Sequence, residues 1–109
     1  MTALIDTGAS ISLLDEELIS QLRLVRYGEV SLLFPDKEEP VARATFLSAM
    51  AFATSYAADS FVDWPDFWEV AAFTPGTRPF RAVLGMDVLS RGDLTLMRQG
   101  TVSFDFSPF

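Results

Sequence analysis

The sequence predicts an all-β fold with one or two short helices, in a single domain that spans residues 1–109. Three observations support this prediction. The chain has 109 residues, which is a typical length for one domain. Half of these residues are hydrophobic, so the chain can bury a core of its own. The apolar residues gather in short runs separated by Gly, Pro and Asp, and such runs are typical of strands joined by turns.

The first part of the chain predicts two short strands and one helix. Residues 2–5 form an apolar run that we expect to be a buried strand, and residues 11–14 form a second. Residues 15–24 predict a helix, because Asp15 can cap its N-terminus, acidic residues follow in the first turn, and apolar positions recur at helical spacing. We expect residues 27–28, Tyr-Gly, to end this region.

The middle of the chain predicts a β-hairpin over residues 29–50, with the polar turn 35–40 between two apolar arms. Residues 44–58 are ambiguous, because their alanine content favours a helix while their apolar continuity fits a strand buried on both faces. Residues 59–65 are expected to be a loop, and residues 67–74 a strand.

The C-terminal part predicts a buried strand over residues 80–84 that stops at Gly85. A short helix is expected next, over residues 87–91. Residues 93–97 and 101–106 predict a terminal hairpin, because a polar turn containing glycine separates two apolar arms.

Histidine and cysteine are both absent from the sequence, which removes several kinds of active site. Without cysteine there is no disulfide, thiolate nucleophile or thiolate metal site, and without histidine there is no Ser-His or Cys-His dyad. The single lysine, Lys37, stands among acidic residues in a polar turn and is poorly placed as a catalytic amine. Chemistry by this chain would depend on carboxylates and hydroxyls, and we expect no metal or cofactor.

The acidic balance of the chain argues against a nucleic-acid partner. The net charge is −7 and the pI is near 4.3, whereas phosphate binding needs clustered Lys and Arg. No signal peptide is visible, and the longest uncharged apolar tract, residues 44–58, is short for a membrane span. We therefore expect no membrane partner, and the cytoplasm is the default location.

Two segments far apart in the sequence point to a chemistry. An apolar strand leads directly into Asp6-Thr7-Gly8-Ala9-Ser10, and Val83-Leu84-Gly85-Met86-Asp87 lies near the C-terminus. Asp-Thr-Gly alone is a common turn sequence, because Asp and Gly favour turns. Together, however, the two segments resemble those of the retropepsin-like aspartic proteases, including the small single-lobe bacterial members. The resemblance covers nearly the whole chain in order.

The resemblance implies a single-lobe, acid-protease-like closed barrel and the activity of an aspartic endopeptidase. Asp6 would supply the catalytic carboxylate, Thr7 would hydrogen-bond to the facing loop, and Gly8 would let the loop turn sharply. Ser10 could hydrogen-bond near Asp6. The nucleophile would be a water molecule activated by one carboxylate while a second donates a proton to the peptide carbonyl.

Such hydrolysis needs two carboxylates close together, and this chain contains one Asp-Thr-Gly loop. The resemblance therefore implies a homodimer in which Asp6 of each copy faces the other across a two-fold axis. Its other partner would be a peptide or protein substrate. Residues 35–40 correspond in position to the flap hairpin of the family, although their tip is charged and lacks glycine.

Two features depart from the family pattern. Only five residues precede Asp6, where the family usually has a further hairpin, and Ser10 and Met86 replace an ion pair of the retroviral members. These departures keep two alternatives open. The chain could be a catalytically inactive domain for dimerisation or peptide binding, or a structural fragment of a larger protein.

The remaining notable side chains have structural interpretations. Phe61, Trp64, Phe67 and Trp68 would form either an exposed docking patch or, as we favour, part of the core or of a dimer interface. Asp87 is expected to cap the short helix and to take no part in chemistry.

Overall fold

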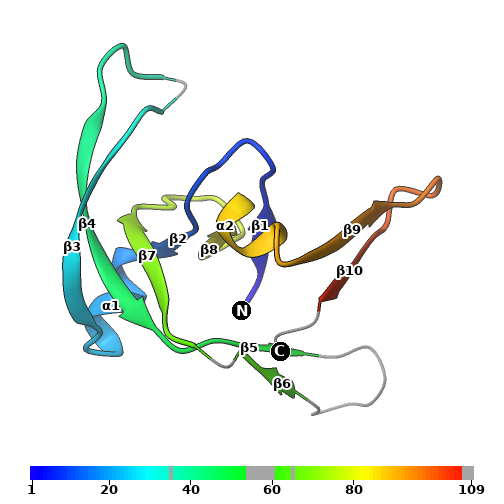
Figure 1. Ribbon diagram of the computed structural model, residues 1–109. Coiled ribbons are helices and arrows are strands. Elements are labelled where there is room, and N and C mark those ends of the chain that lie inside the picture. The colour runs from blue at the N-terminus through cyan, green and yellow to red at the C-terminus, as the bar shows by residue number, and fades with distance from the viewer. Residues whose placement is uncertain (35, 54–60, 65, 107–109) are drawn as a thin grey trace.

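Ten strands and two short helices build the part of the chain that the computed structural model describes, which comprises residues 1–34, 36–53, 61–64 and 66–106 (Figure 1). The predicted all-β class is confirmed, and neither described helix is long and apolar enough to span a membrane. The helices are α1 (Glu16–Gln21) and α2 (Met86–Leu89), and the strands are β1 (Ala3–Ile5), β2 (Leu13–Asp15), β3 (Val25–Leu32), β4 (Val41–Ser48), β5 (Ala51–Ala53), β6 (Phe61–Asp63), β7 (Trp68–Phe73), β8 (Ala82–Leu84), β9 (Gly92–Leu96) and β10 (Val102–Phe106).

Six of the strands form one sheet in the order β1-β8-β2-β7-β4-β3. β1 is parallel to β8 and β2 is parallel to β7, whereas β2 is antiparallel to β8. β1 and β2 are consecutive in the sequence, yet β8 lies between them in the sheet. The segment that joins them, residues 6–12, therefore crosses the end of β8, and it arches close to α2 in Figure 1.

The large sheet has two free edges, β1 and β3, and no sheet closes on itself in the described residues. The closed barrel therefore remains a prediction. The expectation that residues 2–5 form a buried strand is wrong, because β1 lies at a sheet edge and Leu4 is 41% exposed. An apolar run predicts a strand, but it does not distinguish a central strand from an edge strand.

Helix α1 begins where the sequence predicts it and ends earlier. The Asp15 carboxylate accepts a hydrogen bond from the Glu17 amide at 3.0 Å, which confirms the predicted N-cap. The helix stops at Gln21 and does not reach residue 24, because Arg23 takes a positive φ of 53° that a right-handed helix cannot accommodate.

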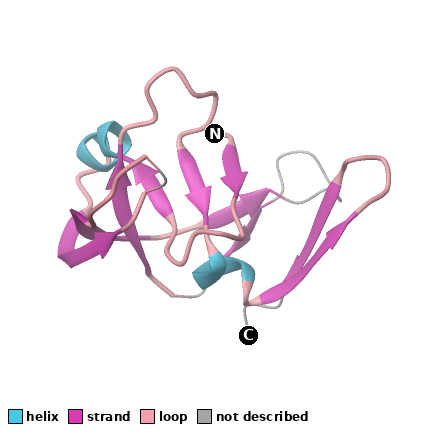
Figure 2. Cartoon of the chain, turned by 90° about the horizontal axis from the view of Figure 1, so that it is seen from above, coloured by secondary structure: helices cyan, strands magenta, loops and turns pink. Residues whose placement is uncertain are grey.

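Both predicted hairpins are present, β3–β4 and β9–β10, and each pairs antiparallel. Tyr27 and Gly28 do not end the region before the first hairpin, as expected, but lie inside β3. A β-bulge between Arg26 and Gly28 takes up the irregularity and lets the pairing continue. The two hairpins project to opposite sides of the central strands in both views (Figures 1 and 2).

The ambiguous residues 44–58 are strand as far as Ser48 and again in β5, and residues 54–58 lie outside the described residues. The expected loop over residues 59–65 instead contains β6, which pairs with β5. Its residues 59, 60 and 65 are also outside the described residues. The predicted strand over residues 67–74 is present as β7.

The hydrophobic core gathers side chains of the large sheet, both helices and Trp64, and the aromatic stretch divides between core and surface. Trp64 and Trp68 are buried and pack edge to face, with ring centroids 5.1 Å apart. Phe61 and Phe67 are exposed. Of the favoured alternatives, core or dimer interface, the core is confirmed for the two tryptophans. The two phenylalanines lie outside the core, and their place in a dimer interface stays a prediction. The buried cluster is completed by apolar side chains from α1, α2 and the sheet: Leu14, Ile19, Val70, Ala82 and Val88.

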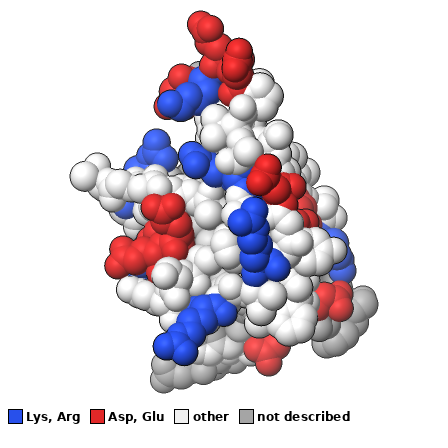
Figure 3. Space-filling view, turned by 90° about the vertical axis from the view of Figure 1, so that its left-hand side faces the viewer, with Lys and Arg blue, Asp and Glu red and all other residues white. Residues whose placement is uncertain are grey.

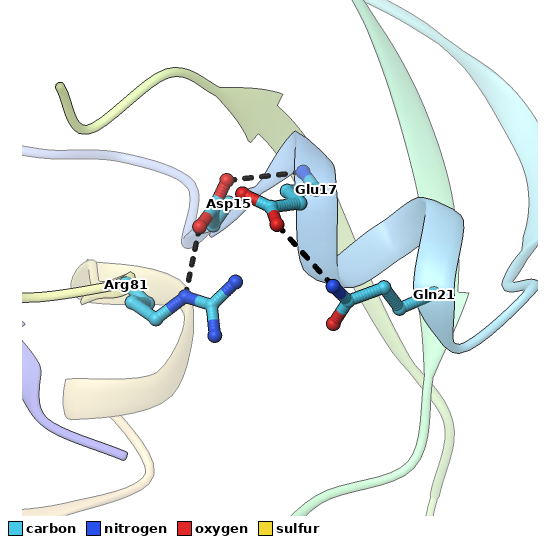
Figure 4. Close-up of polar contacts among 4 residues, drawn as sticks. All are labelled: Asp15, Glu17, Gln21 and Arg81. Carbon is cyan, nitrogen blue, oxygen red and sulfur yellow. Dashed lines mark hydrogen bonds and ion pairs between the residues drawn. The ribbon is translucent and has the colours of Figure 1, made fainter.

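A buried carboxylate fixes α1 to the segment that leads into β8. The Arg81 guanidinium donates to Asp15 at 2.9 Å (Figure 4). The Asp15 amide donates in turn to the Arg81 carbonyl at 2.8 Å. The Arg81 hydrogen bond, together with the Glu17 amide, lowers the pKa of Asp15 below its ordinary value. Asp15 thus has two functions, as helix cap and as ion-pair partner.

Asp15→Asn is expected to lower the melting temperature at neutral pH, and to lower it by less as the pH falls below about 4. Asn can still cap the helix, so the substitution mainly removes the ion pair with Arg81. Because folding lowers the pKa of Asp15 below its unfolded value of about 3.9, this stabilisation is complete above that value. It is lost progressively as the pH falls from there through the lower pKa of the folded state. Thermal denaturation from pH 2 to 7 measures the effect.

Asp93→Asn, which changes an exposed carboxylate on β9, is the matched control and should move the melting temperature little at any pH. The assigned ion pair would be contradicted if the melting temperatures of the native protein and Asp15→Asn differed by the same amount at pH 2 and at pH 7.

Candidate active site

The loop over residues 6–12 is held at its beginning by β8 and by its own backbone. The Asp6 amide donates to the Leu84 carbonyl at 3.0 Å, which extends the pairing of β1 with β8. The Gly8 amide then donates to Oδ1 of Asp6 at 2.9 Å, and the Ala9 amide donates to the Asp6 carbonyl at 3.2 Å. These bonds close a tight turn in which the Asp6 carboxylate is oriented by the backbone.

Gly85 passes this loop at a distance that no larger residue could tolerate. A Cβ atom placed on Gly85 would lie 2.7 Å from the carbonyl oxygen of Ala9 and 2.9 Å from the carbonyl group of Ile11. The Met86 amide also donates to the Ala9 carbonyl at 2.7 Å. The two segments that the sequence singled out are therefore in direct backbone contact, with glycine at the closest point.

Asp6 opens onto a groove of about 410 Å³ between the loop and the first arm of the β3–β4 hairpin. Its carboxylate is partly exposed, and among the described residues it is the one acidic group that lines this groove. Oδ2 accepts no hydrogen bond from the described residues, so it is free to meet a ligand. The other lining residues are small or apolar: Gly8, Ala9, Ser10, Ile11 and Leu13 from the loop side, and Ser31, Leu32, Leu33 and Phe34 from the hairpin.

The hairpin wall of this groove ends in a charged tip. Residues 36–39 are exposed, as expected for a solvated turn, and charged side chains gather at this end of the molecule in Figure 3. Below the tip, the Arg43 guanidinium lies 5.5 Å from the ring centroid of Phe34, which braces an aromatic residue of the groove wall.

The structure brings Asp6 and Gly8 together, while Thr7 and Ser10 make no contact with the carboxylate. Thr7 is exposed, and the facing loop to which it was expected to bond would belong to a second copy. Ser10 is exposed and lines the groove. The expected hydrogen bond between Ser10 and Asp6 is not formed, and the Asp6 carboxylate accepts from the Gly8 amide instead.

Three polar side chains meet behind the loop, Ser12, Trp68 and Asp87, and the sequence did not reveal that they bond to one another. Asp87 does not cap α2, whose N-cap is Gly85, but accepts hydrogen bonds from Ser12 and from the indole of Trp68. A signal existed, because Ser12 and Asp87 each interrupt an otherwise apolar run. A buried Trp also needs an acceptor for its N–H group.

The described residues contain no group of three or more Asp, Glu, His or Cys side chains that could hold a metal ion. Comparison of the chain with protein-family models, curated proteins and solved structures finds no match. The interpretation of the site therefore depends on its own residues and geometry.

Gly85→Ala is expected to destabilise the protein by about 1–3 kcal/mol, because a methyl group would collide with backbone that cannot rotate away. Gly28→Ala is the matched control, since its Cβ would meet Oγ1 of Thr45 at an ordinary 3.6 Å. Urea denaturation of both variants measures the difference. Equal stability of the two variants would show that the loop does not lie against Gly85 as described.

Proposed function

We propose that the chain is an aspartic endopeptidase that works as a homodimer, with Asp6 of each copy forming the catalytic pair. The observation that carries the proposal is the placement of a partly exposed carboxylate, with one free oxygen, on a backbone-braced loop at the edge of an apolar groove. The resemblance of the two contacting segments to retropepsin-like proteases adds to it. A lobe of the acid-protease type belongs to the same proposal.

The proposed reaction uses two carboxylates that share one proton, because like charges at short range do not both ionise easily. The ionised carboxylate takes a proton from water as the water oxygen bonds to the peptide carbonyl carbon. The protonated carboxyl gives its proton to the carbonyl oxygen. As the tetrahedral intermediate collapses and its C–N bond breaks, the leaving nitrogen takes the proton that the first carboxylate had removed from water. The second carboxylate recovers a proton from a hydroxyl of the intermediate, which restores the singly protonated pair.

A second copy is required because Asp6 is alone in its groove. The sequence contains one Asp-Thr-Gly, and no other carboxylate among the described residues lines the groove. Thr7 and Gly8 are exposed, so a second loop can approach the first. Thr7 would then bond across the two-fold axis and hold the two carboxylates at a fixed separation.

The substrate that suits this groove is an extended peptide. The groove lies between the loop and one arm of a hairpin, and its lining is apolar apart from Asp6 and two serines. Apolar side chains on either side of the scissile bond would be desolvated there. The hairpin would act as a flap that closes over the peptide and excludes bulk water.

Asp6→Asn is expected to reduce peptide cleavage by at least about 10²–10⁴-fold, because the amide cannot accept or deliver the proton. Cleavage of a diverse peptide mixture, followed by mass spectrometry between mildly acidic and neutral pH, measures the effect. Asp63→Asn, which alters an exposed carboxylate of β6, is the control and should cleave normally. Full activity in Asp6→Asn would eliminate the proposal.

Mixing Asp6→Asn with the native chain is expected to inhibit cleavage. Each heterodimer would hold a single Asp6 and would be inactive, so activity should fall with the square of the native fraction after subunit exchange. Activity that falls only in proportion to the native fraction would indicate a site complete within one chain. Native protein that binds peptides but cleaves none would favour the peptide-binding alternative.

A further inference from the structure

Behind the Asp6 loop, one carboxylate collects hydrogen bonds from three separate parts of the fold. Oδ1 of Asp87 accepts from the Ser12 hydroxyl at 2.7 Å and from the Val88 amide at 2.9 Å. Oδ2 accepts from the Ser12 amide at 3.0 Å and from Nε1 of Trp68 at 2.9 Å. A carboxylate offers about four acceptor sites, so this set occupies all of them.

Ser12 connects this carboxylate to the loop and to the segment that crosses it. Its hydroxyl donates to Asp87 and accepts from the Gly85 amide at 3.0 Å, and its carbonyl accepts from the Ala71 amide in β7 at 3.0 Å. Ser12 is 2% exposed, and it is the last residue of the loop that Asp6 begins. The far end of the loop is therefore fixed to β7, β8 and α2 together.

Trp68 supplies the rigid support for this arrangement. Its indole is buried against Trp64, and the Arg91 guanidinium lies 6.0 Å from the ring centroid of Trp68 and 5.4 Å from that of Trp64. A ring held on its faces and edge cannot swing away, so its N–H group is a fixed donor toward Asp87. Through this bond the large sheet orients the Asp87 carboxylate.

We propose that Asp87 and Trp68 are positioning residues for Asp6, acting through Ser12. Residues 6–12 are tied at one end to β8 and at the other to Asp87, so the second tie determines where the Asp6 turn stands relative to Gly85. Among the described residues, Asp87 is the acceptor for both donors of Ser12, its amide and its hydroxyl. Its own oxygens are fully occupied by donors, so it holds the loop without meeting substrate.

Asn cannot replace Asp87 in this setting, although it has the same shape. The amide offers one oxygen, and its NH₂ group would face donors where the carboxylate presents an acceptor. At least two of the four donors would lose their partner, and buried unpaired donors are costly. Trp68→Phe is milder, because it keeps an aromatic ring in the core and places no new polar group beside the donors. It removes the indole N–H group together with the five-membered ring, so it also leaves a small cavity next to Trp64.

The kinetic test depends on the proposed protease activity. Asp87→Asn is expected to lower kcat about 10²-fold with KM nearly unchanged, since misplacing a reacting group by about 1 Å has an effect of that size. Trp68→Phe should lower kcat less. Ser12→Ala should lower kcat, and Ser12→Thr should recover part of it because the hydroxyl returns. Ser48→Ala removes a buried hydroxyl that donates to the Ala49 carbonyl, and it is the matched control with normal kcat.

A second readout does not depend on activity. Amide hydrogen exchange of Gly8 and Gly85 should accelerate in Asp87→Asn and in Trp68→Phe, while the Thr45 amide in β4 keeps its native rate. Accelerated exchange with unchanged kcat in an active enzyme would overturn the positioning role. So would unchanged exchange of Gly8 and Gly85, or a rise that is equal at Gly8, Gly85 and Thr45.

The two proposals fail in distinguishable ways. In one outcome the native protein cleaves no peptide, yet the amides of Gly8 and Gly85 exchange faster in Trp68→Phe while that of Thr45 does not. This outcome would remove the protease proposal and keep the support of the Asp6 loop by Asp87. In the other outcome the native protein cleaves peptides, and Trp68→Phe and Asp87→Asn have the same kcat and amide exchange rates as the control Ser48→Ala. This outcome would remove the positioning role alone.

Discussion

The close passage of Gly85 beneath the Asp6 loop is the constraint on which the rest of the structure depends. Residues 6–12 must cross the end of β8, because β8 separates β1 from β2 in the sheet. The crossing brings Gly85 so close to the carbonyls of Ala9 and Ile11 that an added Cβ atom would lie 2.7–2.9 Å from them. Packing at this density leaves no room for a side chain, so the geometry of the loop and the identity of residue 85 are set together.

The same crossing explains why polar groups gather behind an apolar loop. A strand that ends at Gly85 leaves backbone amides that need acceptors, and Ser12 and Ala9 supply them. Ser12 in turn needs an acceptor for its own amide and hydroxyl, and Asp87, in the first turn of α2, supplies it. In the proposed arrangement, the partly exposed carboxylate of Asp6 is positioned by a second carboxylate, whose four hydrogen bonds come from Ser12, Val88 and Trp68.

Local features of the fold could be predicted from the sequence, whereas their pairing could not. The cap at Asp15 and both hairpins follow from side-chain chemistry within a few residues. The prediction that β1 is buried was wrong, because the order of strands in the sheet depends on contacts between residues nearly eighty positions apart, such as Leu4 and Val83. The prediction that Tyr27 and Gly28 end the region before the hairpin was wrong, because a β-bulge can accommodate a residue that favours a turn.

In the candidate site, too, the local features could be predicted from the sequence and the long-range contacts could not. Asp6 and Gly8 could be named from a motif, since a short loop carries its own turn chemistry. The support by Ser12, Asp87 and Trp68 could not, because each residue has a common structural explanation when it is considered alone. Only the fold shows that one carboxylate serves all three segments.

The central claim is that two copies of the chain contribute Asp6 to one site, and binding stoichiometry tests it most directly. The probe is a peptide in which a hydroxyl-bearing tetrahedral carbon replaces the scissile carbonyl, titrated calorimetrically into the native chain at a concentration where the chain is dimeric. A site shared by two chains predicts one peptide bound for every two chains, and no such binding to Asp6→Asn. One peptide bound per chain, with Asp6→Asn binding equally well, would contradict it.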